Sequence, residues 1–170
     1  MEILQVSWIE KKLMWKPVLR KVSFWVNAWE IYGFLWPNGA WKTTTMKSIL
    51  WFIHPEAWKI SIFGKDQLDI ESKKKIGFMP ENTYLYKHLT WREFLLFNAK
   101  FFGYKEADWG KKITSLLEKV WLGSAWDKKL SEYSKGMLQR VWLAQAILND
   151  PKLVFLDVRW VVLILLVGEW

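Results

Sequence analysis

One short segment, residues 36–45, carries the residues whose types and spacing point most clearly to chemistry. With glycine at positions 36 and 41, it would match the phosphate-binding loop G-x-x-x-x-G-K-[ST], whose backbone N–H groups and helix N-terminus bind phosphates. Lys42 would then reach the β- and γ-phosphates of a nucleotide, and the Thr43 hydroxyl would bind Mg²⁺. The residues expected to hold the nucleotide are Trp36, Pro37, Asn38, Gly39, Ala40, Trp41, Lys42, Thr43 and Thr44.

Tryptophan at both ends of this loop conflicts with the geometry that phosphate binding needs. Glycine is required there because the backbone takes positive φ and approaches the phosphates closely. An indole at position 41 would fill the space that the phosphates need. The simpler alternative is an ordinary Asn-Gly turn that precedes a surface lysine, with no phosphate site.

Tryptophan is abundant in the whole chain, and much of it stands where glycine is expected. The sequence has 15 tryptophans and 9 glycines, the reverse of the usual order in globular proteins. Turns and helix ends, which favour glycine, hold Trp29, Trp51, Trp58, Trp91 and Trp126. Because UGA encodes tryptophan in some genetic codes and glycine in another, our hypothesis is that UGA glycine codons were translated as tryptophan.

The hydrophobic pattern around the loop predicts an α/β domain. A buried strand over 31–35 and a helix over 42–52 would flank the loop, which is the context that phosphate binding requires. We expect an antiparallel sheet from strands near 2–8, 18–25 and 59–63. Strands 76–79 and 153–157 should join 31–35 in a mainly parallel central sheet.

Helical patterns dominate between Glu81 and Asn149. Helices are expected near 92–102, 113–120 and 137–148, and Thr90 with Glu93 predicts a capping box at the start of the first. The large apolar residues of that helix are expected in the core: Phe94, Leu95, Phe97, Phe101 and Phe102.

Together with the loop, three further motifs resemble the ATP-binding subunit of ABC transporters over residues 1–157. Leu153–Asp157 resembles the Walker B strand, and Asp157 would hold Mg²⁺ through water. Glu81 stands at the Q-loop position, as in the branch that works with ABC-2-type exporter permeases. A signature-like segment would cap, with its serine and backbone amides, the γ-phosphate bound by a second subunit. Its residues are Ser134, Lys135, Gly136 and Met137.

The resemblance implies an α/β fold of the P-loop NTPase, ABC ATPase type. Its central sheet would be joined by an antiparallel β-subdomain and by a helical subdomain over about 82–149. The implied cofactors are ATP and Mg²⁺, with Glu81 and Asp157 as catalytic residues. The implied partners are an integral membrane permease and a second nucleotide-binding subunit in a head-to-tail dimer, at the cytoplasmic face of the cell membrane.

Several positions depart from the family pattern. Met14 stands where the family has an aromatic residue that stacks on adenine, and Val158 replaces the catalytic glutamate that follows Asp157. Residues 158–170 are interpreted as a frameshifted tail, because a shifted frame can be chosen that continues Pro-Met-Ser-Gly-Leu-Asp-Pro. The resemblance implies an ATPase, whose ATP binding and hydrolysis power a membrane transporter. Because of these departures, the alternative function is a catalytically inactive, truncated nucleotide-binding fold.

Composition restricts the remaining functional classes. The chain has no cysteine, which excludes disulfides and metal–thiolate sites and suits a reducing cytosol. Its net charge of +8 comes from lysines scattered along the sequence, so a solvated surface is favoured over a nucleic-acid site. The apolar run Val161–Val167 is far shorter than the ~20 residues of a membrane helix. His54 and His88 are expected at the surface.

Overall fold

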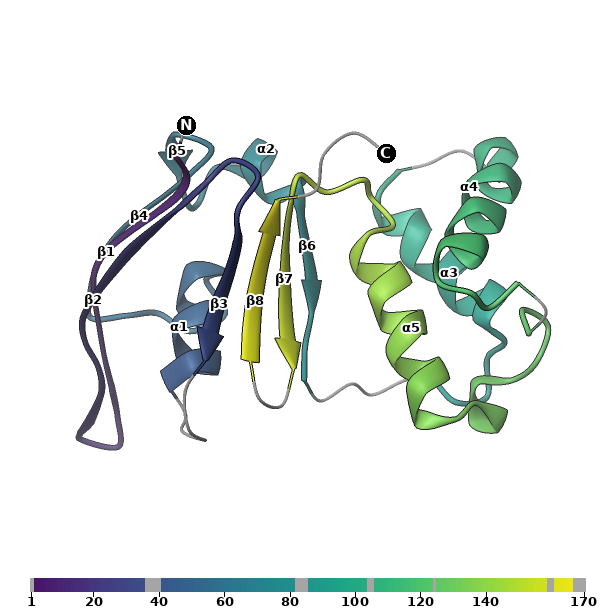
Figure 1. Cartoon of the computed structure of the whole chain (residues 1–170), viewed down its shortest axis with the longest axis horizontal. Helices are drawn as coiled ribbons and strands as arrows, with labels where there is room; N and C mark the ends of the chain where they lie inside the picture. Colours follow the sequence, from purple (N-terminus) through teal and green to yellow (C-terminus); the bar gives the residue numbers. More distant parts are fainter. Residues whose placement is uncertain are drawn as a thin grey trace. The chain divides into compact units, whose positions relative to one another are not determined.

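The structure, a computed structural model, describes residues 2–35, 41–81, 86–103, 106–123, 125–158 and 161–166 (Figure 1). The chain divides into two compact units, one made of residues 1–81 with 152–170 and the other of residues 82–151. Within the described ranges, no helix is long and apolar enough to cross a membrane.

The first unit contains an antiparallel sheet built on a long hairpin. Its strand order is β2-β1-β4-β5. The strands are β1 (Glu2–Leu13), β2 (Lys16–Asn27), β4 (Ala57–Ile62) and β5 (Lys65–Asp66). Leu4 and Val6 are buried while Gln5 between them is exposed, the alternation of a sheet with one covered face. The predicted antiparallel sheet is confirmed, with a longer hairpin than expected and with β5 as an unpredicted edge strand.

The second sheet of this unit has the order β3-β8-β7-β6. Its strands are β3 (Ile31–Leu35), β6 (Ile76–Met79), β7 (Leu153–Val158) and β8 (Val161–Leu166). β6 runs parallel to β7, and β8 runs antiparallel to both β7 and β3. The three predicted strands therefore share one direction. β8, which falls in the segment interpreted as a frameshifted tail, was not predicted; its Val162 and Ile164 are fully buried.

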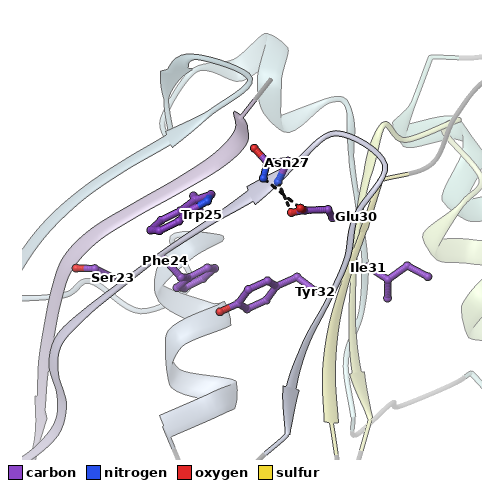
Figure 2. Close-up of a pocket in the computed structure, with 7 residues that line it drawn as sticks. All are labelled: Ser23, Phe24, Trp25, Asn27, Glu30, Ile31 and Tyr32. Atoms are coloured by element: carbon purple, nitrogen blue, oxygen red, sulfur yellow. Dashed lines mark hydrogen bonds between the residues drawn. The ribbon is translucent and has the colours of Figure 1, made fainter.

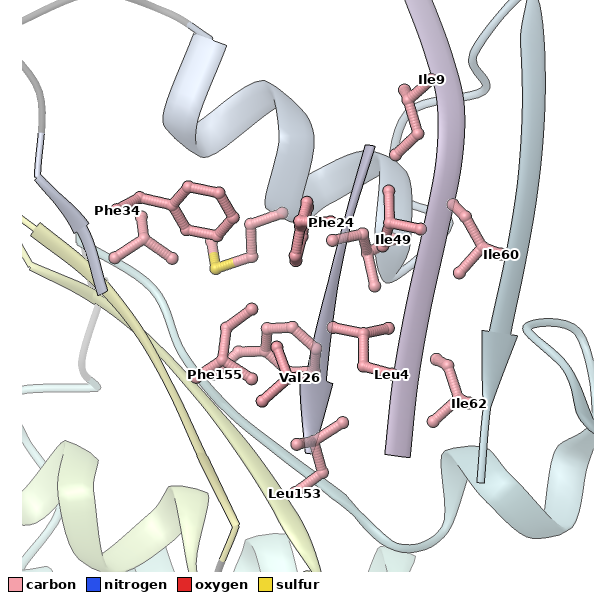
Figure 3. Close-up of a cluster of buried hydrophobic side chains, with 14 of the residues drawn as sticks. Leu4, Ile9, Phe24, Val26, Phe34, Ile49, Ile60, Ile62, Leu153 and Phe155 are labelled. Carbon is pink, nitrogen blue, oxygen red and sulfur yellow. The ribbon is translucent and has the colours of Figure 1, made fainter. Parts of the chain in front are cut away.

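Helix α1 (Trp41–Ile49) lies between the two sheets (Figure 1). Met46 and Ile49 on this helix join Phe24 from β2 and Phe155 from β7 in one buried cluster (Figure 3). The helix ends three residues earlier than predicted, and Trp51 follows it with φ 65°. A short helix, α2 (Ile70–Lys73), follows β5.

The second unit is helical, as predicted. It contains α3 (Trp91–Phe101), α4 (Glu106–Lys119), the 3₁₀ turn η1 (Leu130–Glu132) and α5 (Lys135–Ala146). The capping box at α3 is confirmed, because the Thr90 N–H donates to the Glu93 carboxylate at 2.8 Å and the Glu93 N–H donates to Thr90 Oγ1 at 3.2 Å. Each capping bond satisfies a donor that the first helical turn leaves unpaired.

The expectation that all the large residues of α3 are buried is wrong for three of them. Phe94 and Leu95 are 3% and 0% exposed, but Phe97, Phe101 and Phe102 are 46%, 74% and 42% exposed. Residues 91, 94 and 95 share one face of the helix, whereas 97 and 101, four residues apart, share another. Helical spacing, and not aromatic character, therefore decides which rings enter the core.

Candidate functional site

Thr43 and Asp157 meet in the first unit although 114 residues separate them in sequence. Thr43 lies in the first turn of α1, and Asp157 lies near the end of β7. The Thr43 hydroxyl donates toward both carboxylate oxygens of Asp157, at 3.2 Å to Oδ2 and 3.4 Å to Oδ1. The two side chains predicted to bind Mg²⁺ are thus in contact.

Asp157 is a nearly buried carboxylate, with 4% of its surface exposed. Burial raises the pKa of Asp157 above its usual value, and this is the largest effect; the negative charge of Glu81 raises it further. The hydrogen bond from Thr43 and the charges of Lys47 and Lys42 lower the pKa. Desolvation outweighs these favourable contacts because water is removed from the charged form.

Two lysines of α1 contribute positive charge beside this carboxylate. Lys42 is only 6% exposed, and Lys47 lies one helical turn after Thr43. The N-terminus of α1 adds the positive end of a helix dipole. Lys42 was predicted, whereas Lys47 was missed; its four-residue spacing from Thr43 is the signal that could have identified it.

The loop that should surround the phosphates lies mostly outside the described residues, which exclude Trp36, Pro37, Asn38, Gly39 and Ala40. At its end, Trp41 is half-buried and packs edge-on against Phe34 of β3, with 5.9 Å between ring centroids. The indole of Trp41 therefore contacts the core cluster. Thr44 follows in α1 as a buried residue, 4% exposed.

The remaining predicted residues of the first unit occupy different places. Glu81 lies two residues after the end of β6 and is exposed. Its negative charge raises the pKa of Asp157. Met14 lies in the turn between β1 and β2 and is 93% exposed. No hydrogen bond, ion pair or ring contact found in the described ranges joins Met14 to Thr43 or Asp157.

The signature-like segment lies in the second unit, at the start of α5. Ser134 is the N-cap residue, and its Oγ accepts a hydrogen bond from the Met137 N–H at 3.3 Å. Lys135 and Gly136 are exposed in the first turn. The serine and the amides that follow it are therefore at a helix N-terminus, the local geometry that anion binding requires.

An open pocket of about 610 Å³ lies between β2 and β3 in the first unit, apart from the predicted site residues (Figure 2). Phe24 and Tyr32 stack along it at 5.1 Å. Its carboxylate, Glu30, accepts bonds from the Asn27 backbone at 2.8 Å and from Asn27 Nδ2 at 3.1 Å, which closes the turn between the strands. The pocket thus lacks the pairing of hydroxyl, carboxylate and lysines found around Asp157.

Comparison with known families agrees with this geometry. Residues 19–158, from β2 to the last residue of β7, match the family model described as ABC transporter. The chain belongs to this family. The predicted resemblance to its ATP-binding domain and the predicted fold class are confirmed.

Relatives of this ABC transporter chain include proteins named as ATP-binding proteins. An uncharacterized ABC transporter ATP-binding protein of Nostoc is 41% identical over 88% of the chain and 44% of its own length. The Nod factor export ATP-binding protein I of Burkholderia lata is 38% identical over 88% of the chain and 50% of its own length. The chain therefore spans about half the length of these curated relatives.

Solved structures show the same fold. An ATP-binding subunit of an ABC transporter superposes with a TM-score of 0.72 and 28% identity, covering 89% of this chain and 64% of the other. CbiO1 from Clostridium perfringens, part of the ABC transporter complex cbiONQ, superposes with a TM-score of 0.76 at 20% identity, over 92% and 65%.

The residues around Asp157 fit Mg²⁺, the metal that an ABC ATPase uses with its nucleotide. Thr43 and Asp157 offer a hydroxyl and a carboxylate, and Mg²⁺ commonly takes one or two protein oxygens plus phosphates and waters. The parts of the chain that the structure describes hold no group of three or more His, Cys, Asp or Glu suited to a metal. The remaining ligands would therefore come from the nucleotide and from water.

Proposed function

We propose that this chain is the ATP-binding part of a membrane transporter, which binds ATP with Mg²⁺ and couples its hydrolysis to transport. The observation that carries the proposal is the contact of Thr43 Oγ1 with Asp157 at 3.2 Å. It joins the end of the phosphate-loop segment to the strand that resembles the family's Walker B motif. Family membership supports the same activity.

At this site, different residues of the chain would bind the phosphates, hold Mg²⁺ and contact the base. The α1 N-terminus and Lys42 would bind the phosphates, while Thr43 and Asp157 would hold Mg²⁺, which neutralises phosphate charge. Glu81 would orient groups near the γ-phosphate, and Met14 would contact the base. The segment Trp36, Pro37, Asn38, Gly39, Ala40, Trp41 and Thr44 would complete the phosphate site, with glycine needed at 36 and 41.

A nucleotide-binding experiment tests this proposal. The doubly substituted Trp36→Gly/Trp41→Gly protein should bind a fluorescent ATP analogue in the presence of Mg²⁺ at least ten times more tightly than the unsubstituted chain. Adding Lys42→Ala to the same background should remove that gain, because the lysine contacts the phosphates directly. Equal binding with and without Lys42 would overturn the assignment of the site.

Hydrolysis is a separate step because Val158 stands where the family has its catalytic glutamate. In the glycine background, Val158→Glu should raise the rate of phosphate release, since a carboxylate there can orient the attacking water. The alternative function, an inactive truncated fold, predicts no nucleotide binding by any of these variants. The relatives from Nostoc and Burkholderia lata, which are named as ATP-binding proteins, do not favour it.

The partner in this proposal is a permease that spans the membrane, so the chain would lie at the cytoplasmic face. An exposed aromatic stripe on the second unit supports it: Tyr86, Phe97 and Phe101, whose neighbouring ring centroids are 6.2 Å and 5.2 Å apart. Contiguous exposed apolar side chains typically mark interaction sites. CbiO1, a structural neighbour, is part of a transporter complex.

Co-purification tests the partner. A multi-spanning membrane protein encoded next to this gene should be retained by the tagged chain and lost with Phe97→Ser/Phe101→Ser. The control is Ile70→Ser, which removes from α2 an apolar side chain that is 69% exposed, against 74% for Phe101 and 46% for Phe97. Loss with the control as well would show that the stripe has no specific role.

A second nucleotide-binding subunit is also proposed, and Ser134, Lys135, Gly136 and Met137 would face its nucleotide.

A further inference from the structure

Five tryptophans of this chain have backbone conformations that suit glycine. Of the described residues other than glycine, nine have positive φ, and five of these nine are tryptophan, although tryptophan supplies only 15 of 170 residues. Bulky side chains are genuine outliers in this region because Cβ crowds the following carbonyl. The five are Trp8, Trp15, Trp29, Trp51 and Trp121.

Two of them end helices in the same way. After α1, the Trp51 N–H donates to the Ser48 carbonyl at 3.2 Å, and the next N–H, of Phe52, donates to the Lys47 carbonyl at 2.7 Å. This pair of bonds defines the Schellman motif, in which the residue at C′ takes the left-handed conformation and is usually glycine. Trp51, with φ 65°, occupies C′.

Helix α4 ends with the same two bonds. The Trp121 N–H donates to the Glu118 carbonyl at 3.0 Å and the Leu122 N–H donates to the Leu117 carbonyl at 3.0 Å. The φ of Trp121 is 54°. Helix α3 provides an internal comparison, because the residue after its C-cap is Gly103, with φ 71° and an N–H that donates to the Lys100 carbonyl at 3.3 Å. One helix thus ends with glycine where two others end with tryptophan.

Two more occupy tight turns that select glycine. Trp15, with φ 69°, is the second residue of the two-residue turn between β1 and β2, and Met14 before it also has positive φ. A hairpin turn with two positive φ values prefers glycine at its second position. Trp29, with φ 68°, is the third residue of the turn closed by Glu30 N–H and Asn27 O at 3.4 Å, where a type II turn requires glycine.

The fifth lies in a β-bulge. The register of β1 against β2 shifts between Val6 and Ile9, and Trp8, inside that interval, has φ 54°. Bulges of this kind often have glycine at the left-handed position. Burial of the indoles does little to offset this backbone strain, because Trp8, Trp15, Trp29 and Trp121 are 60%, 94%, 76% and 80% exposed.

We propose that the protein made in its own cell carries glycine at positions 8, 15, 29, 51 and 121, because its UGA codons are decoded as glycine. Three of these positions, 8, 15 and 121, are identified by the backbone alone. The proposal extends to the phosphate loop, and there it rests on the proposed function: the form that binds nucleotide has glycine at 36 and 41. Backbone geometry, which is independent of any nucleotide, carries the five positions.

The direct test is mass spectrometry of peptides from the protein isolated from its own cells. Peptides that contain positions 8, 15, 29, 51 and 121 should have the masses of the glycine forms. Tryptophan masses at these positions would overturn the proposal. Genomic sequencing gives a parallel readout, since UGG at the five codons would also overturn it.

A stability experiment tests the physical argument. The protein with all five tryptophans replaced by glycine should have a thermal midpoint roughly 10–20 °C above that of the protein with all five replaced by alanine. Both variants lose the indoles, so the difference isolates the left-handed conformation. Equal midpoints would refute the backbone argument.

A control distinguishes these positions from tryptophan in general. Trp25 in β2 is 61% exposed and lacks positive φ, so Trp25→Gly should not raise the midpoint, because glycine weakens a strand interior. All midpoints are measured without nucleotide. A gain in stability combined with no ATP binding by the Trp36→Gly/Trp41→Gly protein would therefore refute the proposed function and leave the glycine assignment standing.

Discussion

The contact between Thr43 and Asp157 should contribute measurably to stability, and Thr43→Val tests it. Valine keeps the shape of threonine but removes the hydroxyl that donates to Oδ2 at 3.2 Å and Oδ1 at 3.4 Å. Because Asp157 is only 4% exposed, water cannot fully replace the lost donor. A hydrogen bond to a charged group is worth about 1.5–3 kcal/mol, so we expect a loss of unfolding free energy of that size at pH 7.

The pH dependence of this loss follows from the pKa of Asp157. Burial raises that pKa above the reference value of 3.8, so the folded protein binds the proton more tightly than the unfolded chain. The ionised carboxylate therefore lowers stability at neutral pH, and this cost disappears as the pH falls through the raised pKa toward 3.8. The effect of Thr43→Val should shrink over the same range, since a protonated carboxyl depends less on the donor.

The assay is a double-mutant cycle with Asp157→Asn, measured by urea unfolding at pH 7. Asp157→Asn alone removes a desolvated charge and should leave stability unchanged or raise it. In that background Thr43→Val should cost at least about 1 kcal/mol less than in the parent chain, because contacting residues are coupled. If Thr43→Val costs the same in both backgrounds, the hydrogen bond does not connect the two residues energetically and the reasoning about this site is refuted.

Three further predictions concern the framework around the site. Thr90→Ala should lower the unfolding free energy by about 1 kcal/mol in urea titrations, through loss of the α3 capping box. The hydrogen bond from the Thr90 backbone lowers the pKa of Glu93. The contribution of the Glu93 carboxylate to stability should therefore fade as the pH falls from 4.5 through that lowered pKa. Phe155→Ala should cost about 3–5 kcal/mol in the same assay, since the ring is fully buried; a cost below 1 kcal/mol would contradict the described core. Gly103→Ala should lower the unfolding free energy by about 1 kcal/mol, because alanine is strained at a φ of 71°. An added Cβ would meet nothing within 4 Å, so the loss would come from the backbone conformation alone. No change would count against the backbone argument for the tryptophans.

The sequence predicted the elements that position the site because their signals are local. The apolar run before residue 36 and the helical pattern after it gave β3 and α1, and the Thr90–Glu93 spacing gave the capping box. The pairing of Thr43 with Asp157 is different. No local pattern connects residues 114 positions apart, so that contact came from the family resemblance.

Features that depend on pairing or on a helix face were missed. Apolar composition predicts that Phe97 and Phe101 of α3 are buried, but their four-residue spacing puts both on the exposed side of the helix. The glycine-like conformations of Trp29 and Trp51 follow from the sequence pattern of a turn and of a helix end. The same expectation is wrong for Trp58, Trp91 and Trp126, which lack positive φ. That of Trp8 could not be predicted, since its bulge exists only in the register of β1 against β2.

Strand β8 lies outside the family match, yet it pairs with two strands of the sheet and buries Val162 and Ile164. Val162 lies opposite both Phe34 of β3 and Asp157 of β7, so β8 joins the two strands that lead to the site. Ladder hydrogen bonds come from the backbone, and any short apolar segment with β-branched residues can supply them while burying its side chains. Burial of Val162 and Ile164 is therefore expected of such a segment whether it arose by descent or by a shift of reading frame. The direction of β8 has the same physical cause, because only two residues separate β7 from β8 and so short a connection joins antiparallel strands. The family match ends at residue 158, before β8 begins, and the frameshifted origin of this segment stays a prediction.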